Sequence, residues 1–244
     1  MLGKYVRVRI TKPVRSRNEQ YGYEYELNYG LIESGRQFGK NVCGAYVMGV
    51  DRPVRNFDGR VIAVIKRKDS SDVYLVVAPK STRFIESQIR DAVAFSQPDD
   101  DYTLDCLYER SCGAVVYRII NGEVRYLLIK NKRSAHWGFP KGHMERSETP
   151  EQTAKREVLE ETGVHIEIIP DFSLKSEYTI QGKVEKSVII FMAKTSDVQT
   201  KIQKEEIDDY IWQCYDKAVE MLKFDNDRAI LKSGNQFLID KGII

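Results

Sequence analysis

The sequence predicts an α/β protein of two domains, in which a small, mainly-β barrel domain precedes a mixed sheet that lies between helices. With 244 residues the chain is long enough for two hydrophobic cores. Runs of β-branched and aromatic residues dominate residues 1–95, whereas strand and helix patterns alternate over residues 108–244. Residues 96–107 include a polar run with one proline and three successive aspartates, so we expect a linker there.

The first domain is predicted to contain four strands, at its runs of β-branched and aromatic residues. These runs are Tyr5–Ile10, Tyr21–Tyr29, Val61–Arg67 and Val73–Val77. One helix is expected over Phe84–Phe95, because apolar residues recur there at helical spacing and Thr82 precedes the segment as a candidate cap. The first domain should therefore be mainly β with a single helix near its end.

The second domain begins with a predicted hairpin, because two apolar runs meet at Asn121-Gly122 and both residues accept the positive φ of a tight primed turn. Further strands are expected at Val164–Ile169, Ser176–Ile180, Ser187–Ala193 and Asp209–Cys214. Helices are expected at Pro150–Thr162, at Asp216–Lys223 and from Arg228 towards the carboxyl end. This interleaving predicts a mixed sheet packed between helices.

The charge balance excludes a general attraction to polyanions. The 38 basic and 36 acidic side chains leave a net charge of +2, so binding to DNA or to an anionic membrane would need a local patch. Charges interrupt the apolar runs near the amino terminus, so we expect no signal peptide, no membrane span and a cytoplasmic location. The four cysteines lack paired spacing, which favours reduced thiols over a zinc site or a disulfide framework.

Local signals specify both ends of a helix from Pro150 to Thr162. Thr149 and Gln152 have the spacing of a capping box, and proline is favoured at the first position of a helix. Gly163 suits the left-handed residue that commonly ends a helix. Both ends of this helix are therefore specified by local sequence.

Three carboxylates of this helix, Glu157, Glu160 and Glu161, lie three and four residues apart on one surface. Such like charges repel each other by a few tenths of a kcal/mol per pair on an isolated helix. A divalent cation would turn this cost into binding, and Mg²⁺ suits hard oxygen ligands, with Mn²⁺ as the alternative metal. A merely solvated helix would need neither Gly142 nor Glu148 upstream, so we favour a metal site.

Seven residues of this region stand at the fixed positions of the Nudix box, G-x5-E-x7-R-E-U-x-E-E-x-G-U, where U is apolar. They are Gly142, Glu148, Arg156, Glu157, Glu160, Glu161 and Gly163. The region therefore resembles the Nudix family, which implies an α/β/α sandwich and a pyrophosphohydrolase activity. The resemblance also implies that Arg156 pairs with Glu148 and so orients the metal-binding carboxylates.

The segment Trp137–His143 is similar to the W-x-x-P-K-G-H of the asymmetrical diadenosine tetraphosphate hydrolases. Four later segments also resemble that family, namely Ser176–Tyr178, Lys183–Val188, Glu206–Trp212 and Gly234–Leu238. The substrate-binding residues that this resemblance implies are Lys141, His143, Tyr178, Lys186 and Phe237. The lysines and the histidine would contact phosphates, while the tyrosine and the phenylalanine would stack on adenine.

The segment Glu206–Trp212 resembles the family's E-x-x-x-Y-x-W, which implies that Glu206 completes the metal site from a loop, with Glu205 as the alternative. The metal ligands implied in this way are Gly142, Glu157, Glu160, Glu161 and Glu206. The catalytic residues implied are Glu161, Glu206, Arg156 and Glu148. Either Glu161 or Glu206 would take the proton of the attacking water.

Together these resemblances imply a Mg²⁺-dependent hydrolase of dinucleoside polyphosphates that converts diadenosine tetraphosphate to ATP and AMP. Two alternatives remain open: an RNA 5′-pyrophosphohydrolase, whose W-x-x-P-x-G segment is similar, and a binding module that senses a nucleotide. The complete carboxylate set argues against a sensor, and the small net charge argues against a nucleic-acid partner other than an RNA 5′ end. No membrane partner is expected, and the sequence does not define the oligomeric state.

Several stretches of the first domain share a second pattern, namely Asn28–Ile32, Ala45–Asp51, Asp58–Ile65 and Asp72 before Val77-Ala78-Pro79. They resemble a short form of the soluble inorganic pyrophosphatase barrel, which implies clustered aspartates that hold metal ions immediately before a strand. The stretch from Phe38 to Tyr46 contains no acid, and Gly44 stands where an aspartate is expected. We therefore expect no pyrophosphatase activity from residues 1–95.

Overall fold

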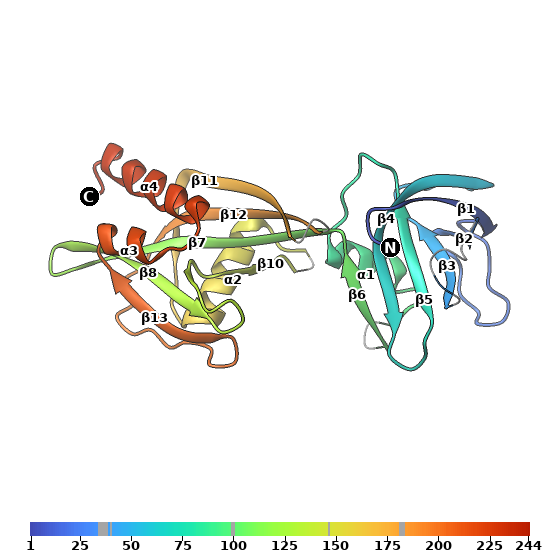
Figure 1. Ribbon diagram of the computed structural model, residues 1–244, viewed down its shortest axis with the longest axis horizontal. Helices are drawn as coiled ribbons and strands as arrows, with labels where there is room; N and C mark the ends of the chain where they lie inside the picture. Colours follow the sequence, from blue (N-terminus) through green and yellow to red (C-terminus); the bar gives the residue numbers. More distant parts are fainter. Residues whose placement is uncertain (34–38, 40, 99–100, 146, 181–183) are drawn as a thin grey trace. The chain divides into compact units, whose positions relative to one another are not determined.

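The computed structural model describes residues 1–33, 39, 41–98, 101–145, 147–180 and 184–244. Phe38 and Lys40 of the predicted acid-free stretch, and Asp99 and Asp100 of the predicted linker, therefore lie outside the described residues. The chain divides into two compact units, drawn in Figure 1. The first unit contains Met1–Glu109 and Thr179–Lys186, and the second contains Arg110–Tyr178 and Ser187–Ile244.

The first unit is built around a closed β-barrel. Its strands are β1 (Tyr5–Lys12), β2 (Asn28–Ile32), β3 (Val42–Val47), β4 (Asn56–Arg67), β5 (Val73–Ala78) and β6 (Tyr102–Cys106). They lie in the order β1-β2-β3-β5-β4-β6, and β1 also pairs with β4, which closes the first five strands of this order into a barrel. Strands β3 and β5 run parallel, whereas β1–β2, β2–β3, β4–β5 and β4–β6 are antiparallel.

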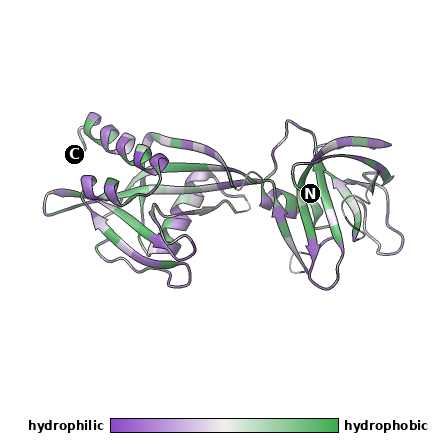
Figure 2. Ribbon diagram, viewed as in Figure 1, coloured by the Kyte–Doolittle hydropathy of each residue, from purple (hydrophilic) through white to green (hydrophobic). Residues whose placement is uncertain are grey.

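Alternating residues of the barrel strands fill two buried clusters, as the period of two in a strand requires. Val8, Val61 and Leu75 belong to one cluster, and Ile62 and Ile65 belong to the other. Helix α1 (Glu86–Val93) contributes its two buried side chains to the second of these clusters. Figure 2 shows hydrophobic residues along the strands of both units.

The predicted strand Tyr21–Tyr29 is wrong over most of its length. Only its last two residues join β2, and the rest belongs to the loop between β1 and β2. The alternating tyrosines imitate a strand, but Tyr23 and Tyr25 pack their rings against Phe95, with centroids 5.5 Å and 5.9 Å apart. Ring packing in a loop has here produced the periodicity of a strand.

The predicted linker at residues 96–107 is also wrong in part, because Tyr102–Cys106 is strand β6 and its first residue is buried. Polar residues alternate with buried ones on this edge strand, so composition alone suggested a linker. Thr82 does not cap α1, since its hydroxyl donates to a carbonyl in the preceding turn. The side chain of Gln88 instead accepts from the amide of Ile85, at 3.1 Å.

The second unit is a seven-stranded sheet with helices on both faces. Its strands are β7 (Tyr108–Ile120), β8 (Glu123–Asn131), β9 (Trp137–Gly138), β10 (Lys141–His143), β11 (Glu167–Ile180), β12 (Val184–Lys194) and β13 (Ile207–Gln213). The main order is β11-β12-β7-β8-β13, while β10 pairs with β7 and β9 pairs with β8. The predicted β7–β8 hairpin is confirmed, with Asn121 at φ 52° and Gly122 at φ 82°.

Successive residues of β7 face opposite helices. Ala114 and Val116 lie in a buried cluster with residues of α2 (Pro150–Thr162). Val115 and Tyr117 lie in another cluster, with residues of α3 (Tyr215–Met221) and α4 (Asp225–Asp240). The predicted arrangement of a sheet between helices is therefore confirmed.

Two predicted strands meet in one long strand, β11, which contains the last three residues of Val164–Ile169 and all of Ser176–Ile180. Pro170 and Asp171, which lie between the two predicted segments, are accommodated inside the strand, with Asp171 at φ 68°. Across the residues that the structure describes, no helix has the length and apolarity needed to cross a membrane.

Candidate active site

Helix α2 presents its charged side to the short strand β10. Its predicted capping box is present: the Thr149 hydroxyl accepts from the Gln152 amide at 3.3 Å, and the Gln152 side chain accepts from the Thr149 amide at 2.7 Å. Gly163 ends the helix in the left-handed conformation, at φ 66°. Ala154 and Val158 are fully buried in the core, which fixes the rotation of the helix and leaves its glutamates beside β10.

Arg156 binds four partners at once and ties the box together. Its guanidinium donates to both carboxylate oxygens of Glu148, at 2.6 Å and 3.0 Å. It also donates to Glu157 at 2.8 Å, to Glu160 at 3.0 Å and to the backbone carbonyl of His143 at 2.9 Å. The structure thus contains the Arg156–Glu148 pair that the family resemblance implied.

Glu148 is the anchor of this network. Besides Arg156, the hydroxyl of Thr153 donates to it at 2.7 Å and the amide of Glu145 at 3.0 Å. The hydrogen bonds from Arg156, more than any other contact, lower the pKa of Glu148 from its ordinary 4.5 to about 2. Glu148 therefore stays ionised and holds Arg156 in place across the neutral pH range.

Two carboxylates of α2 converge on neighbouring residues of β10. Glu161 is only 5% exposed and accepts a hydrogen bond from the backbone amide of Lys141 at 2.9 Å. The carboxylate of Glu157 lies directly on Gly142, where an added Cβ would stand 2.1 Å from Oε2. Only glycine leaves room for this approach, so Gly142, the first fixed position of the Nudix box, allows the carboxylate of Glu157 to pack against the backbone.

Burial governs the acidity of both groups. It raises the pKa of Glu157, and, with smaller contributions from the charges of Glu157 and Glu206, it raises that of Glu161 to about 8. Carboxylates that are buried together at such a cost are the donors that a divalent cation would stabilise. Glu206 acts on Glu161 from the turn before β13, where its side chain is exposed.

These donors fit Mg²⁺, which proteins usually hold through one or two carboxylates while substrate phosphates supply further oxygens. Glu157, Glu161 and the backbone at Gly142 would form the protein's share. In the described part of the chain, no three Asp, Glu, His or Cys side chains already stand close enough together to enclose a metal. Glu160 would add a third carboxylate to this site from the solvent side, where it is half-exposed and bound to Arg156.

A cavity of about 80 Å³ opens beside Lys141 and Glu161. Trp137 and Phe224 line it with aromatic surface, and Asp227 adds a carboxylate whose pKa is raised by burial. Phe224 and Asp227 stand at the start of α4 and were not predicted as site residues. Their only signal in the sequence was an acidic first turn, which also fits an ordinary helix start.

The remaining predicted substrate residues are more dispersed. His143 is exposed on β10, close enough to Glu157 to lower its pKa. Phe237 packs on Phe172, with ring centroids 5.1 Å apart, and so helps to seat α4 on the sheet. Tyr178 is 47% exposed on the same strand as Phe172, six residues further on.

Tyr178 and Phe237 do not form two walls of one slot. Six residues of strand span roughly 20 Å, which is far more than the thickness of a base between two rings. Packing of α4 on the sheet accounts for Phe237, and its predicted role in base stacking stays a prediction. Lys186 belongs to the first unit, where it pairs with Glu109 at 3.4 Å.

A profile of the NUDIX domain matches residues 110–233, just over half of the chain. This chain belongs to the Nudix family. It is similar to the asymmetrical bis(5′-nucleosyl)-tetraphosphatase of Sus scrofa, with 32% identity over 140 residues, 53% of this chain and 95% of that protein. The protein of the same name from Caenorhabditis elegans is 27% identical over 53% of this chain and 96% of its own length.

The crystal structure of a binary complex of a C. elegans Ap4A hydrolase agrees in fold, with a TM-score of 0.51 and 26% identity over 54% of this chain and 98% of the other. The chain is therefore a Nudix hydrolase, and its second unit is the Nudix domain. These similarities lend no support to the pyrophosphatase resemblance of the first domain.

Proposed function

We propose that this Nudix hydrolase cleaves dinucleoside polyphosphates with the help of Mg²⁺ and converts diadenosine tetraphosphate to ATP and AMP. The observation that carries the proposal is the convergence of Glu157 and Glu161 on β10, beside Lys141 and an aromatic cavity. The names of the relatives, which align over nearly their whole length, support the choice of substrate.

The reaction consumes one water. Its oxygen forms a bond to phosphorus, the bond from that phosphorus to a bridging oxygen breaks, and the products are ATP and AMP. Bound Mg²⁺ would supply positive charge to the phosphate oxygens and increase the acidity of the water. Lys141 lines the cavity and brings a second positive charge to the phosphate chain.

Glu206 is the better placed of the two carboxylates that could accept the proton from water. Glu161 is buried, accepts the amide of Lys141 and faces Glu157, so it belongs to the metal-holding pair. Glu206 is exposed in its turn and adjoins this pair, which leaves its oxygens free to meet a water molecule. We expect Glu206→Gln to lower kcat by about 10²-fold while the Mg²⁺ requirement stays constant.

The test is a substrate panel of dinucleoside polyphosphates, nucleotide sugars and 5′-triphosphate RNA, incubated with the full chain and Mg²⁺. Product masses in ¹⁸O-labelled water would show which phosphate takes up the new oxygen. We expect diadenosine tetraphosphate to give ATP and AMP, with the label in one of the two. Preferred release of pyrophosphate from RNA would contradict this substrate and favour the RNA alternative.

The first unit, we propose, shares the barrel of soluble inorganic pyrophosphatases without their catalysis. Its closed barrel supports the architectural part of this proposal. At Gly44, where that family needs an aspartate, an added Cβ would stand 2.2 Å from the Tyr29 hydroxyl. The ring of Tyr29 thus takes the space that a carboxylate side chain would need.

A cytoplasmic site of action also belongs to the proposal. All four cysteines, Cys43, Cys106, Cys112 and Cys214, are free thiols. Free thiols are the usual state of cysteine in a reducing compartment, and burial raises the pKa of the Cys106 thiol to about 12, which makes it unreactive.

A further inference from the structure

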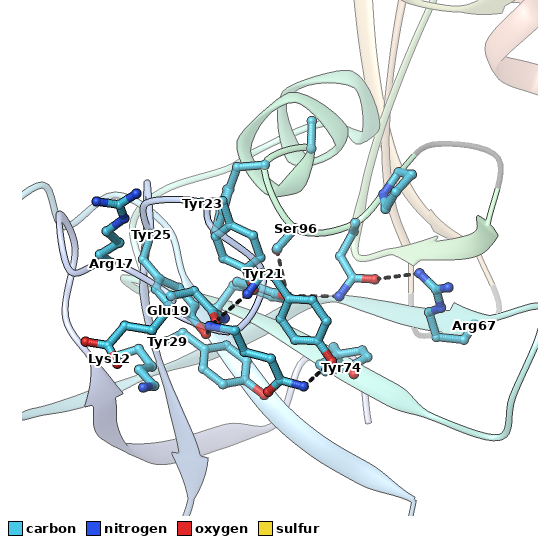
Figure 3. A pocket seen from close by; sticks show the side chains of 17 residues that line it. Lys12, Arg17, Glu19, Tyr21, Tyr23, Tyr25, Tyr29, Arg67, Tyr74 and Ser96 are labelled. Atoms are coloured by element: carbon cyan, nitrogen blue, oxygen red, sulfur yellow. Dashed lines mark hydrogen bonds between the residues drawn. The ribbon is translucent and has the colours of Figure 1, made fainter.

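The first unit contains a hollow of its own, with a volume of about 990 Å³ (Figure 3). Tyrosines dominate its lining, and they are Tyr21, Tyr23, Tyr25, Tyr29, Tyr46 and Tyr74. Nothing in the proposed hydrolysis uses this hollow, because its residues belong to the barrel strands, to the loop between β1 and β2 and to the segment that follows α1, all in the first unit. A large space lined by aromatic rings that serves no known step is a candidate ligand site.

The rings form one continuous array. Tyr25 stacks on Tyr29 at 5.9 Å, Tyr29 meets Tyr46 at 5.0 Å, and Tyr46 meets Tyr74 at 6.1 Å. At the outer end Tyr21 lies parallel to its neighbour Tyr23, with an angle of 10° between the rings, and is 69% exposed. The exposed ring of Tyr21 leaves apolar surface in contact with water, and a ligand that stacks on the ring would cover that surface.

The array is held rigidly at its base. The hydroxyl of Tyr46 accepts hydrogen bonds from Ser96 and from Gln97, both at 2.9 Å. The side chain of Asn18 donates to the hydroxyl of Tyr25 at 3.2 Å, which joins two parts of the loop between β1 and β2. Rings that are already ordered lose little entropy when a ligand binds, so the hollow is preorganised for a planar ligand.

The charges of the lining select an anion. Lys12 and Arg17 stand at one side of the rings and Arg67 at the other, as Figure 3 shows. The only carboxylate among the described lining residues is that of Glu19. A cage for a quaternary ammonium group would need the opposite charge balance, and a site for metal-bound pyrophosphate would need several carboxylates.

The position on the barrel agrees with this reading. Five-stranded barrels of the OB type bind their ligands on the face of the second and third strands and through the loops that follow the first and the fourth strands. Here Tyr29 comes from β2 and Tyr46 from β3, while Tyr21 lies in the loop after β1. Arg67 ends β4 and Tyr74 lies in β5, on either side of the loop between those strands.

We propose that this hollow binds a nucleobase together with its attached phosphate, independently of the Nudix site. The base stacks on the tyrosines, beginning with the exposed Tyr21, and the phosphate lies against Lys12 and Arg17. A free nucleotide and one unit of a single-stranded oligonucleotide offer the same chemistry. The experiment separates these two sources.

The full chain is titrated in EDTA with AMP, with ATP and with a fluorescein-labelled single-stranded RNA octamer, and binding is followed by calorimetry or anisotropy. Tyr21→Ala is compared with Tyr5→Ala, since Tyr5 is a second exposed tyrosine of the barrel, 56% accessible, outside the hollow. Arg17→Gln is compared with Arg9→Gln, an equal change of charge on an exposed arginine elsewhere on the barrel.

We expect Tyr21→Ala to raise Kd roughly fivefold or more, the loss typical of one stacked base, while Tyr21→Phe and Tyr5→Ala keep the original value. If Tyr21→Ala weakens the binding of AMP or ATP, the ligand is a free nucleotide. If it weakens only the binding of the octamer, the ligand is a single strand. Binding that Tyr21→Ala and Tyr5→Ala alter equally would overturn the proposal. So would inorganic pyrophosphate that displaces the ligand as effectively as ATP, because an anion site would then suffice.

Discussion

In each unit a glycine leaves room for a side chain from a neighbouring element, and the two side chains differ in their chemistry. In the Nudix domain, Gly142 has no side chain, and the carboxylate of Glu157 lies on it. In the barrel, Gly44 has no side chain, and the phenol of Tyr29 lies on it. An added Cβ would stand 2.1 Å from the nearest atom at the first position and 2.2 Å at the second. Both glycines therefore seat a side chain from a neighbouring element.

The difference lies in what surrounds the seated group. Further carboxylates and Arg156 lie around Gly142, and burial of the carboxylate charges favours the binding of a cation. Around Gly44 stand further phenols, and burial raises the pKa of Tyr29 and also that of Tyr74, the latter to about 12, so these rings stay neutral. One site suits metal-dependent phosphate chemistry, and the other suits stacking.

The largest effect should follow loss of a metal-site charge. Glu160→Gln keeps the size and helix propensity of the residue but removes a charge from the carboxylate group, so kcat should fall by about 10²-fold or more. Glu160 is half-exposed, so the midpoint of thermal unfolding should hardly move. Glu151→Gln, an exposed acid in the first turn of the same helix, is the matched control. Turnover within tenfold of the parent at limiting Mg²⁺ would show that this helix is not the metal site.

Acid should weaken the carboxylate site and spare the neutral rings. The pKa of Glu148 is about 2 in the folded chain against 4.5 ordinarily, so its ionised form favours folding at every pH above 4.5. That stability, about 3 kcal/mol, is lost as pH falls from about 4.5 to about 2, because Arg156 then loses its partner. Urea unfolding without metal at several pH values measures it. The Glu148→Gln variant should be less stable at pH 7, and its free energy of unfolding should depend less on pH in this window. An equal pH dependence in both proteins would contradict the role assigned to Glu148.

A third change tests whether Tyr178 holds the base of the hydrolysed substrate. If Tyr178 stacks on adenine, Tyr178→Ala should lower kcat/KM for diadenosine tetraphosphate by roughly tenfold to a hundredfold, with Mg²⁺ dependence unchanged. Tyr178→Phe should keep most activity, because the ring face makes the contact. Equal losses in both variants would assign the effect to the hydroxyl. No loss in either would leave Tyr178 as a residue of the sheet.

The Nudix site was predictable because its signals are local. Thr149, Gln152 and Gly163 fix helix α2 within a few residues of each end, and the spacing of the glutamates then places them on one surface. The Arg156–Glu148 pair followed from the family resemblance. Two further residues that line the cavity, Phe224 and Asp227, were not predictable, since nothing near them in the sequence indicates that α4 begins beside Lys141.

The barrel was harder to predict, because its essential pairings are distant in sequence. Strand β3 was missed altogether, since it contains Gly44 and pairs in parallel with β5, about thirty residues later. The hollow escaped notice for the same reason, as its lining comes from four separate segments. One signal was present in the sequence, because Tyr21, Tyr23 and Tyr25 place a ring at every second residue. We interpreted this pattern as a strand and not as the lining of a site.

The two glycines offer a direct test of the comparison. Gly142→Ala should displace the carboxylate of Glu157 and lower hydrolysis about tenfold, with a cost in stability of about 1–3 kcal/mol from overpacking. Gly44→Ala should cost a similar amount by displacing Tyr29, weaken nucleotide binding in EDTA and leave kcat unchanged. Paired assays of hydrolysis and binding on both variants separate these outcomes. Loss of kcat in Gly44→Ala would show that the two sites do not act separately.

The smallest effect is expected for inorganic pyrophosphate, and it tests the barrel alone. In the full chain carrying Glu160→Gln, turnover at the Nudix site is lowered about 10²-fold, so Mg²⁺-dependent release of phosphate from pyrophosphate that this change does not reduce would have to come from the first unit. None is expected, because Tyr29 fills the place of the missing aspartate beside Gly44 and a single carboxylate lines the described part of the hollow. Gly44→Asp should not restore activity either, since its side chain would collide with the same ring. Phosphate release at the same rate as in the parent protein would show that the barrel is a second hydrolase.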